Sequence, residues 1–193
     1  MTKRYQALTF TPAVLEAQRL AYGGDRRPPT VSGPDRLGAA EQSFIRERSA
    51  FYMATVSETG WPYLQHRGGE RGQLLVLDDA TLAFADRPGN RQLLSVGNLQ
   101  LDGRVALLLM DYPGRRRLKI MGRAEVRERS DPGLSSEFEW PADAERLIVI
   151  RVEAFDWNCP KYIEPRYTQA EVDDYVAPLR ARIAELEGRS GIR

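Results

Sequence analysis

The chain has 193 residues, in which 28 lysines and arginines nearly balance 27 aspartates and glutamates, and the formal net charge is +1. This balance excludes a global field that would attract nucleic acid or an anionic membrane, so any anion site has to be local. One cysteine, Cys159, excludes an internal disulfide, and with His66 as the one histidine a zinc or haem site has very few usual ligands.

The first residues contain no long apolar stretch of the kind that a secretory signal needs. The longest strongly apolar run, Val105 to Met110, is far below the roughly 20 residues that span a bilayer. We therefore expect a cytoplasmic protein without a membrane partner, a nucleic-acid partner or a metal. The length favours a single domain over 1–193, with a helical extension over about 1–49 and a C-terminal helix over about 168–189.

The N-terminal segment predicts two helices joined by a surface connection. Thr11 followed by Pro12 suits a helix start, and a helix is expected over 11–21. The glycine- and proline-rich stretch 23–34 cannot continue that helix. Apolar residues then recur at helical spacing over 37–48, which predicts a second helix.

After Ser49 the pattern changes to short apolar runs broken by turn residues. Strands are predicted over 51–56, 61–66, 73–77, 81–85, 104–112, 117–127 and 147–155. The short connections favour antiparallel pairing, since a parallel crossover needs a dozen or more residues, and this indicates a barrel. The run from Val105 to Met110 is expected to be buried on both faces.

Two further helices complete the expected elements. Residues 90–98 are long enough for a short helix between two strands. Over 168–187, Thr168 and Glu171 stand at capping-box spacing and apolar residues trace a helical stripe. We expect this amphipathic helix to pack on the barrel or on a partner.

Two strand-end clusters have the composition of an anion site. Gln65-His66-Arg67-Gly68-Gly69 joins a guanidinium to glycines that let backbone N–H groups come close, although an ordinary turn would have the same composition. Asp86 to Gln92 lies before a helix start, where N–H donors and the helix dipole favour anions, and Arg91 adds charge. The alternative for this cluster is a connecting loop with an Asn cap.

Two other clusters suit the ring of an aromatic cofactor. Alternation predicts that Arg117 and Lys119 share one face of a strand while Leu118 and Ile120 share the other, and a lysine pointing inward could serve a flavin ring or a phosphate. The loop from Phe155 to Tyr167 interleaves aromatics with prolines, which suits either a wall for a flat ring or packing against the last helix. Cys159 is a poor candidate for a Cys-His nucleophile, because the one histidine, His66, lies far from it in the sequence and there is no second histidine.

Taken in order, five motifs resemble a flavin-binding subgroup of the pyridoxamine 5'-phosphate oxidase-like family. They are FYMATV with GWP (51–56 and 60–62), QHRGG (65–69), AD with GNRQ (85–86 and 89–92), RLKIMG (117–122) and DWNCP (156–160). The resemblance covers roughly 51–167 and implies a six-stranded antiparallel split β-barrel, mainly β with flanking helices. It also implies a homodimer that holds FMN in two equivalent clefts lined by both subunits.

Carried over position by position, the resemblance implies a set of cofactor-binding residues. These are His66, Arg67 and Gly68, the phosphate-gripping Asn90, Arg91 and Gln92, Lys119, and a closing loop of Trp157, Asn158, Cys159 and Pro160. A dedicated catalytic acid or nucleophile need not exist, because the flavin itself would accept and return the electrons.

The function expected from this resemblance is that of a flavin-dependent oxidoreductase acting on an unidentified small molecule. True pyridoxamine phosphate oxidases end in a strand segment containing Arg and His, whereas this sequence ends in a helix without histidine, which argues against vitamin B6 oxidation. A non-enzymatic flavin-binding or redox-sensing dimer is the main alternative. A scaffold barrel without cofactor is a third, and haem binding is disfavoured with one histidine and one cysteine.

Overall fold

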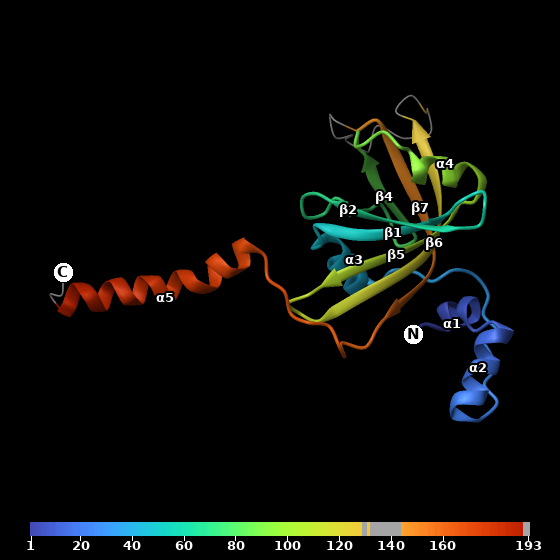
Figure 1. Ribbon diagram of the computed structural model, residues 1–193, viewed down its shortest axis with the longest axis horizontal. Coiled ribbons are helices and arrows are strands. Elements are labelled where there is room, and N and C mark those ends of the chain that lie inside the picture. The colour runs from blue at the N-terminus through green and yellow to red at the C-terminus, as the bar shows by residue number, and fades with distance from the viewer. Residues whose placement is uncertain (129–130, 132–143, 191–193) are drawn as a thin grey trace.

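A single antiparallel sheet forms the body of the protein in the computed structural model, which describes residues 1–128, 131 and 144–190 (Figure 1). The order of its strands is β2-β1-β5-β6-β7-β4-β3. The strands are β1 (Ala50–Val56), β2 (Pro62–Gly68), β3 (Leu75–Val76), β4 (Thr81–Asp86), β5 (Arg104–Asp111), β6 (Arg116–Glu128) and β7 (Arg146–Trp157). All seven predicted strands are present, and the antiparallel split-barrel fold is confirmed. The resemblance implied six strands, whereas the described sheet has seven, because the two-residue β3 adds to β4 at one edge.

The sheet curls until strands that are distant in its order face each other. Three strands separate β1 from β4 in the sheet, yet the rings of Phe51 and Phe84 meet edge to face with centroids 5.1 Å apart. Beside the Phe84 ring, Arg67 of β2 forms an ion pair with Asp86 of β4 at 3.0 Å. Side chains rather than backbone hydrogen bonds therefore bring together the two sides of the split barrel.

The core lies on the inner face of this curled sheet. Along β5, Val105, Leu107 and Leu109 are buried, whereas Ala106 is exposed and Leu108 is only partly buried. The prediction that this strand is buried on both faces is therefore wrong for the single chain. The described elements of this chain leave that part of the outer face open, so the apolar side chains there lack cover.

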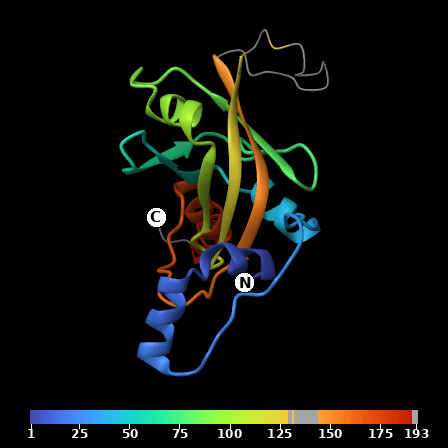
Figure 2. The same ribbon diagram turned by 90° about the vertical axis from the view of Figure 1, so that its right-hand side faces the viewer.

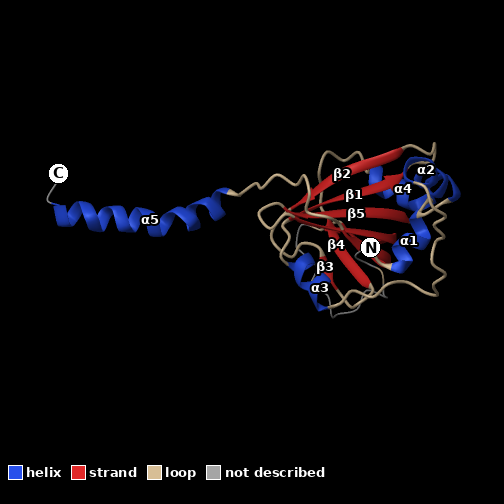
Figure 3. Cartoon of the chain, turned by 90° about the horizontal axis from the view of Figure 1, so that it is seen from below, coloured by secondary structure: helices blue, strands red, loops and turns tan. Residues whose placement is uncertain are grey.

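Five helices flank the barrel in the described part of the chain. They are α1 (Lys3–Thr9), α2 (Pro12–Tyr22), α3 (Ala39–Arg46), α4 (Leu94–Leu101) and α5 (Gln169–Ser190). Figure 2 shows α1 and α2 at the end of the barrel opposite to α4. The extended helix α5 runs away from the barrel rather than packing on its own sheet (Figures 1 and 3).

Two helices differ from the sequence-based prediction. The sequence did not predict α1, because its seven residues bury only Tyr5 and its position depends on β7, where Arg4 pairs with Glu153 at 3.0 Å. Helix α4 begins at Leu94 rather than near residue 90. Arg91 and Leu93 have φ angles of 61° and 52°, which a right-handed helix does not accommodate.

Asp111 organises the turn between β5 and β6. Its carboxylate accepts the backbone N–H of Gly114 at 2.8 Å and pairs with Arg116 at 2.8 Å and with Arg48 at 3.5 Å. A Cβ atom on residue 114 would overlap this carboxylate, so a larger residue there would displace Asp111 from its hydrogen bond. Burial alone would raise the pKa of Asp111, but the Gly114 N–H and the two arginines outweigh it and lower the pKa.

We predict that Asp111→Asn lowers the free energy of unfolding at pH 7 by about 1.5 to 3 kcal/mol, the range for hydrogen bonds to a charged group. Because the folded pKa lies below the ordinary 3.8, this stabilisation is complete above that value and disappears as the pH falls through the folded pKa. Urea unfolding at neutral and acid pH measures both effects. Asp79→Asn is the control, since its pair with Arg36 is exposed and is worth less than about 1 kcal/mol. Equal losses in the two variants, or a difference that persists in acid, would contradict the prediction.

Candidate functional site

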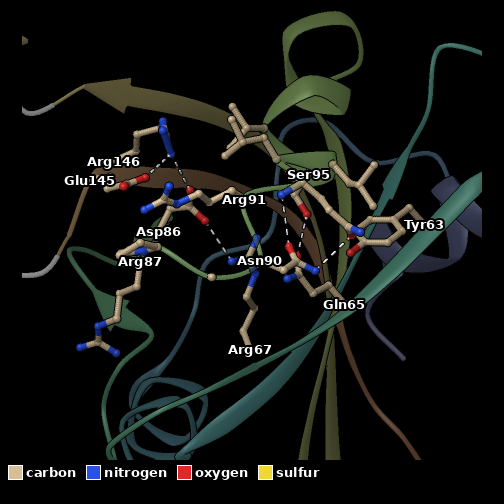
Figure 4. A pocket seen from close by; sticks show the side chains of 16 residues that line it. Tyr63, Gln65, Arg67, Asp86, Arg87, Asn90, Arg91, Ser95, Glu145 and Arg146 are labelled. Carbon is tan, nitrogen blue, oxygen red and sulfur yellow. Dashed lines mark hydrogen bonds and ion pairs between the residues drawn. The ribbon is translucent and has the colours of Figure 1, made fainter.

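A pocket of about 400 Å³ opens where the ends of β2 and β4 meet the start of α4 and of β7 (Figure 4). Its volume lies within the range of small-molecule sites, roughly 300 to 1,000 Å³. Six charged side chains among the described residues line it: Arg67, Arg87, Arg91, Arg146, Asp86 and Glu145. Four guanidinium groups against two carboxylates leave an excess of positive charge in this pocket.

Two hydrogen bonds fix α4 against the sheet and so position one wall of the pocket. The buried Ser95 hydroxyl donates to the Gln65 side-chain oxygen of β2 at 3.1 Å. One turn further on, the Asn98 amide donates to the Thr55 hydroxyl of β1 at 2.8 Å. The loop between β4 and α4 is therefore held at both ends, by β4 itself and by this anchored helix.

Asp86 is the buried carboxylate on which two of the arginines converge. It lies at the end of β4 and pairs with Arg67 at 3.0 Å and with Arg146 at 3.2 Å. The Arg67 guanidinium also lies over the Phe84 ring, 5.3 Å from its centroid. Its Nε is buried and has no hydrogen-bond partner among the described residues. An unsatisfied buried N–H group indicates a site that lacks an acceptor.

The loop from Asp86 to Leu93 carries the other two arginines of the pocket, Arg87 and Arg91. Asn90 accepts the backbone N–H of Gln92 at 3.2 Å, and the two side-chain amides bond to each other at 3.1 Å. Arg91 is exposed, and within the described chain no ion pair neutralises it. Its left-handed backbone and that of Leu93 turn the chain into α4, whose N-terminus receives no side-chain cap.

These features fit a phosphate group better than a neutral ligand. Arg91 and the Arg67 Nε offer donors that no carboxylate occupies, and the uncapped start of α4 adds backbone N–H groups with the positive end of the helix dipole. Asn90 and Gln92 also line the pocket, where the Asn90 amide donates one hydrogen bond to the side-chain oxygen of Gln92. The arginines therefore offer the charge-assisted donors of this pocket.

The structure brings four of the predicted site residues together, namely Arg67, Asn90, Arg91 and Gln92. Two other predicted site residues, His66 and Gly68, flank Arg67 in β2 and lie on the opposite face of that strand. His66 is exposed on the outer face, where its ring meets that of Tyr52 with centroids 5.4 Å apart. Gly68 lies beside the same imidazole, close enough that a Cβ would collide with it.

Lys119 also lies on the outer face. Leu118 and Ile120 are fully buried, as the alternation predicts, whereas Lys119 does not point inward. Its ammonium lies 3.7 Å from the buried carboxylate of Asp156. Within one chain Lys119 therefore contributes to a separate apolar hollow of the outer face, not to the arginine-lined pocket.

The predicted closing loop lies at the far end of β7 from the pocket. Trp157 and Arg146 are the last and first residues of that strand, roughly 30 to 35 Å apart by strand rise. The Trp157 indole donates to Glu41 at 2.6 Å and packs edge to face on Phe44, 4.7 Å between centroids. This is structural packing beneath α3 rather than a wall of the pocket.

The three residues after Trp157 follow it away from the pocket. The Asn158 N–H donates to the carbonyl of Arg117 at 3.3 Å, and Cys159 and Pro160 are exposed. Within one chain the loop therefore cannot close the arginine-lined pocket.

Several lining residues were not predicted as site residues. Arg146 stands before the apolar run of β7, and only the pairing of Asp86 with Arg146 in the sheet brings it to the pocket. Gln65 belonged to a quoted motif, yet its contact with Ser95 depends on where α4 docks. A strand register links these residues, and periodicity along one sequence does not reveal a register.

Two negative observations concern the described residues only. Among them, no three His, Cys, Asp or Glu side chains gather as a group that could hold a metal ion. None of their helices is sufficiently long and apolar to cross a membrane.

Comparison with known proteins gives a match to the family described as pyridoxamine 5'-phosphate oxidase over residues 37–157. No curated protein matches the chain. Among solved structures, a protein from Lactobacillus delbrueckii assigned as a pyridoxamine 5'-phosphate oxidase is 24% identical, with 63% of this chain and 93% of that one covered and a TM-score of 0.49. HupZ from Group A Streptococcus is 13% identical, with 68% and 99% covered and a TM-score of 0.48.

General Stress Protein 26 from Bacillus anthracis is 18% identical, with 65% and 92% covered and a TM-score of 0.44. The family match spans the whole barrel, from Leu37 before α3 to Trp157 at the end of β7, and includes both strand-end clusters that line the pocket. The chain therefore belongs to the pyridoxamine 5'-phosphate oxidase family.

Proposed function

We propose that the chain is an FMN-binding oxidoreductase that acts on a small molecule. The observation that carries this proposal is the arginine-lined pocket, in which Arg91 and the Arg67 Nε lack an acidic partner among the described residues. A phosphate monoester with two negative charges would supply the missing acceptors. Membership of a family whose members typically bind a flavin supports FMN as the source of that phosphate.

In this proposal each part of the pocket has a task toward the cofactor. Arg91 and Arg67 would bind the phosphate, and Asp86 would orient Arg67 through their ion pair. Tyr63 and Gln65, on the same face of β2 as Arg67, would border the chain that leads from the phosphate to the ring. The residues present thus fit the charged end of FMN within one subunit.

When bound, FMN would supply the redox chemistry by accepting and returning electrons. The protein would then bind, orient and control access, with a reduced nicotinamide, a deazaflavin or a small organic donor as the source of hydride. Steady-state turnover above that of free FMN distinguishes this enzyme from a flavin-binding or redox-sensing protein. Absence of any change in flavin absorbance under anaerobic conditions with every donor class would refute the oxidoreductase.

We further propose that the protein is a homodimer with the cofactor at the interface. The outer face of β1, β2, β5 and β6 exposes apolar side chains that a single chain does not cover, and Leu64 has 65% of its surface exposed. This face also carries His66 and Lys119. A second copy packed here would offer a way to bring His66, Lys119 and the loop after Trp157 to the pocket of its neighbour.

We predict that Arg91→Ala weakens FMN binding by about 1.5 to 3 kcal/mol, or roughly 10- to 150-fold in Kd, because one charge-assisted contact is lost. Arg67→Ala should have a similar effect. Fluorescence titration of FMN measures both. Since Arg67 also neutralises Asp86, the thermal stability of each variant is recorded alongside.

The matched control is Arg151→Ala, since Arg151 is an exposed arginine of β7 that lies outside this pocket. It should leave the affinity for FMN unchanged. Wild-type affinity in both Arg91→Ala and Arg67→Ala would place the phosphate elsewhere.

We also predict that Leu64→Glu weakens FMN binding, although Leu64 does not line the arginine-rich pocket. A buried carboxylate on the proposed dimer face costs several kcal/mol, so about a tenfold or larger loss of affinity is expected. Leu20→Glu is the control, because Leu20 is 71% exposed on α2, outside the sheet. If Leu64→Glu binds FMN as the wild type does, this face does not complete the cofactor site.

A further inference from the structure

Helix α5 presents an apolar stripe that remains largely exposed in the single chain. The helix has 22 residues and projects from the barrel both in Figure 1 and in the view from below in Figure 3. The exposed fractions of Val172, Leu179, Ile183 and Leu186 lie between 41% and 55%. Scattered exposed leucines are ordinary, but a stripe along an entire helix indicates an interface.

The composition of α5 makes isolation in solvent unfavourable. Pro178 lies inside the helix, where it removes one backbone hydrogen bond, and Gly188 lowers helix propensity further. Most helical stability in proteins comes from packing of an apolar face rather than from propensity. A stable α5 therefore requires a partner surface along its stripe.

The spacing of the stripe indicates which partner. From Val172 the apolar positions follow at intervals of four, three, four and three residues, at Val176, Leu179, Ile183 and Leu186. This is a heptad repeat with Val176 and Ile183 at the a positions and leucines at two of the three d positions. In parallel coiled coils, β-branched residues at a with leucine at d favour two strands over three or four. Pro178 falls at a c position, outside the contact seam.

The charges beside the stripe indicate a parallel orientation of the two helices. In a parallel pair a g residue faces the next e residue of the partner, which sets Arg182 against Glu187 of the second copy. In an antiparallel pair g faces g, and the g residues are Tyr175, Arg182 and Arg189, so Arg182 would face another arginine or Tyr175 and would lose its acidic partner. Within the single chain Arg182 pairs with Glu185, and among the described residues Glu187 has no ion pair.

We propose that the α5 helices of two copies of this chain pair in parallel as a short two-stranded coiled coil. A second copy supplies the same stripe and the complementary charges without any further protein. The seam has five core positions, so it acts together with contacts between the barrels rather than alone. The proposed coiled coil does not depend on a bound cofactor, so its test is independent of the proposed flavin function.

The test is disulfide trapping in the full-length protein, with Cys159→Ser to remove the native thiol. Leu186→Cys at a d position would place two thiols face to face in a parallel pair, within the short Cα separation that a disulfide needs. Ala181→Cys, at an f position on the opposite side of the helix, is the control. Mild oxidation should give on the order of tenfold more covalent dimer with Leu186→Cys. Equal yields, or no dimer with Leu186→Cys, would overturn the proposal.

Charge reversal tests the orientation in the same Leu186→Cys background. Arg182→Glu should reduce the yield of dimer, because two glutamates then oppose each other. Adding Glu187→Arg should restore the yield, since the pair is re-formed with its signs exchanged. No loss in the first variant, or no restoration in the second, would rule out the parallel register. These side chains lie on an exposed helix outside the barrel, so the barrel core is unchanged in every variant.

Discussion

One buried carboxylate joins strand ends that the backbone leaves apart. Asp86, at the end of β4, pairs with Arg67 on β2 and with Arg146 at the start of β7. No backbone ladder connects β2 to β4 in the described sheet, so this cluster and the packing of Phe84 bring the two sides of the barrel together. Without Asp86 the two arginines would repel each other, and the pocket between them would lose its shape.

The same cluster supports the proposal that this end of the barrel binds an anion. A buried ion pair contributes little net stability compared with apolar packing, so an excess of arginines around one carboxylate suggests a function. Arg91 lies on a left-handed turn held between β4 and the anchored helix α4, and its charge is not neutralised within the described chain. The fold thus provides orientation through Asp86 and spare positive charge through the adjoining loop.

The sequence predicted those parts of the fold that depend on local pattern. Alternation along β6 correctly separated Leu118 and Ile120 from Lys119. The two clusters that the sequence singled out, one with Arg67 and one with Arg91, line the same pocket. Arg146 was missed because its place follows from the register of β7 on β4. From the sequence, the loop with Trp157 could form a wall for a flat ring or pack against the last helix. The structure shows instead that within one chain the Trp157 indole packs against α3.

The outer face and α5 could not be placed from one sequence for a related reason. An apolar pattern indicates that a surface is buried by packing, but it does not show whether the packing partner belongs to the same chain or to another. In the single chain both surfaces remain open, which directs the account toward a second copy. The two surfaces differ in kind, since one is a broad face of the sheet and the other is a narrow stripe along one helix.

The central claim is that arginines at the joined strand ends hold the phosphate of a flavin. Equilibrium dialysis of the wild-type protein against FMN and against riboflavin, which has the same ring without the phosphate, tests it most directly. The account predicts that FMN binds at least about tenfold more tightly than riboflavin, the value of one charge-assisted hydrogen bond. Equal affinity for the two flavins, or no binding of either, would contradict it.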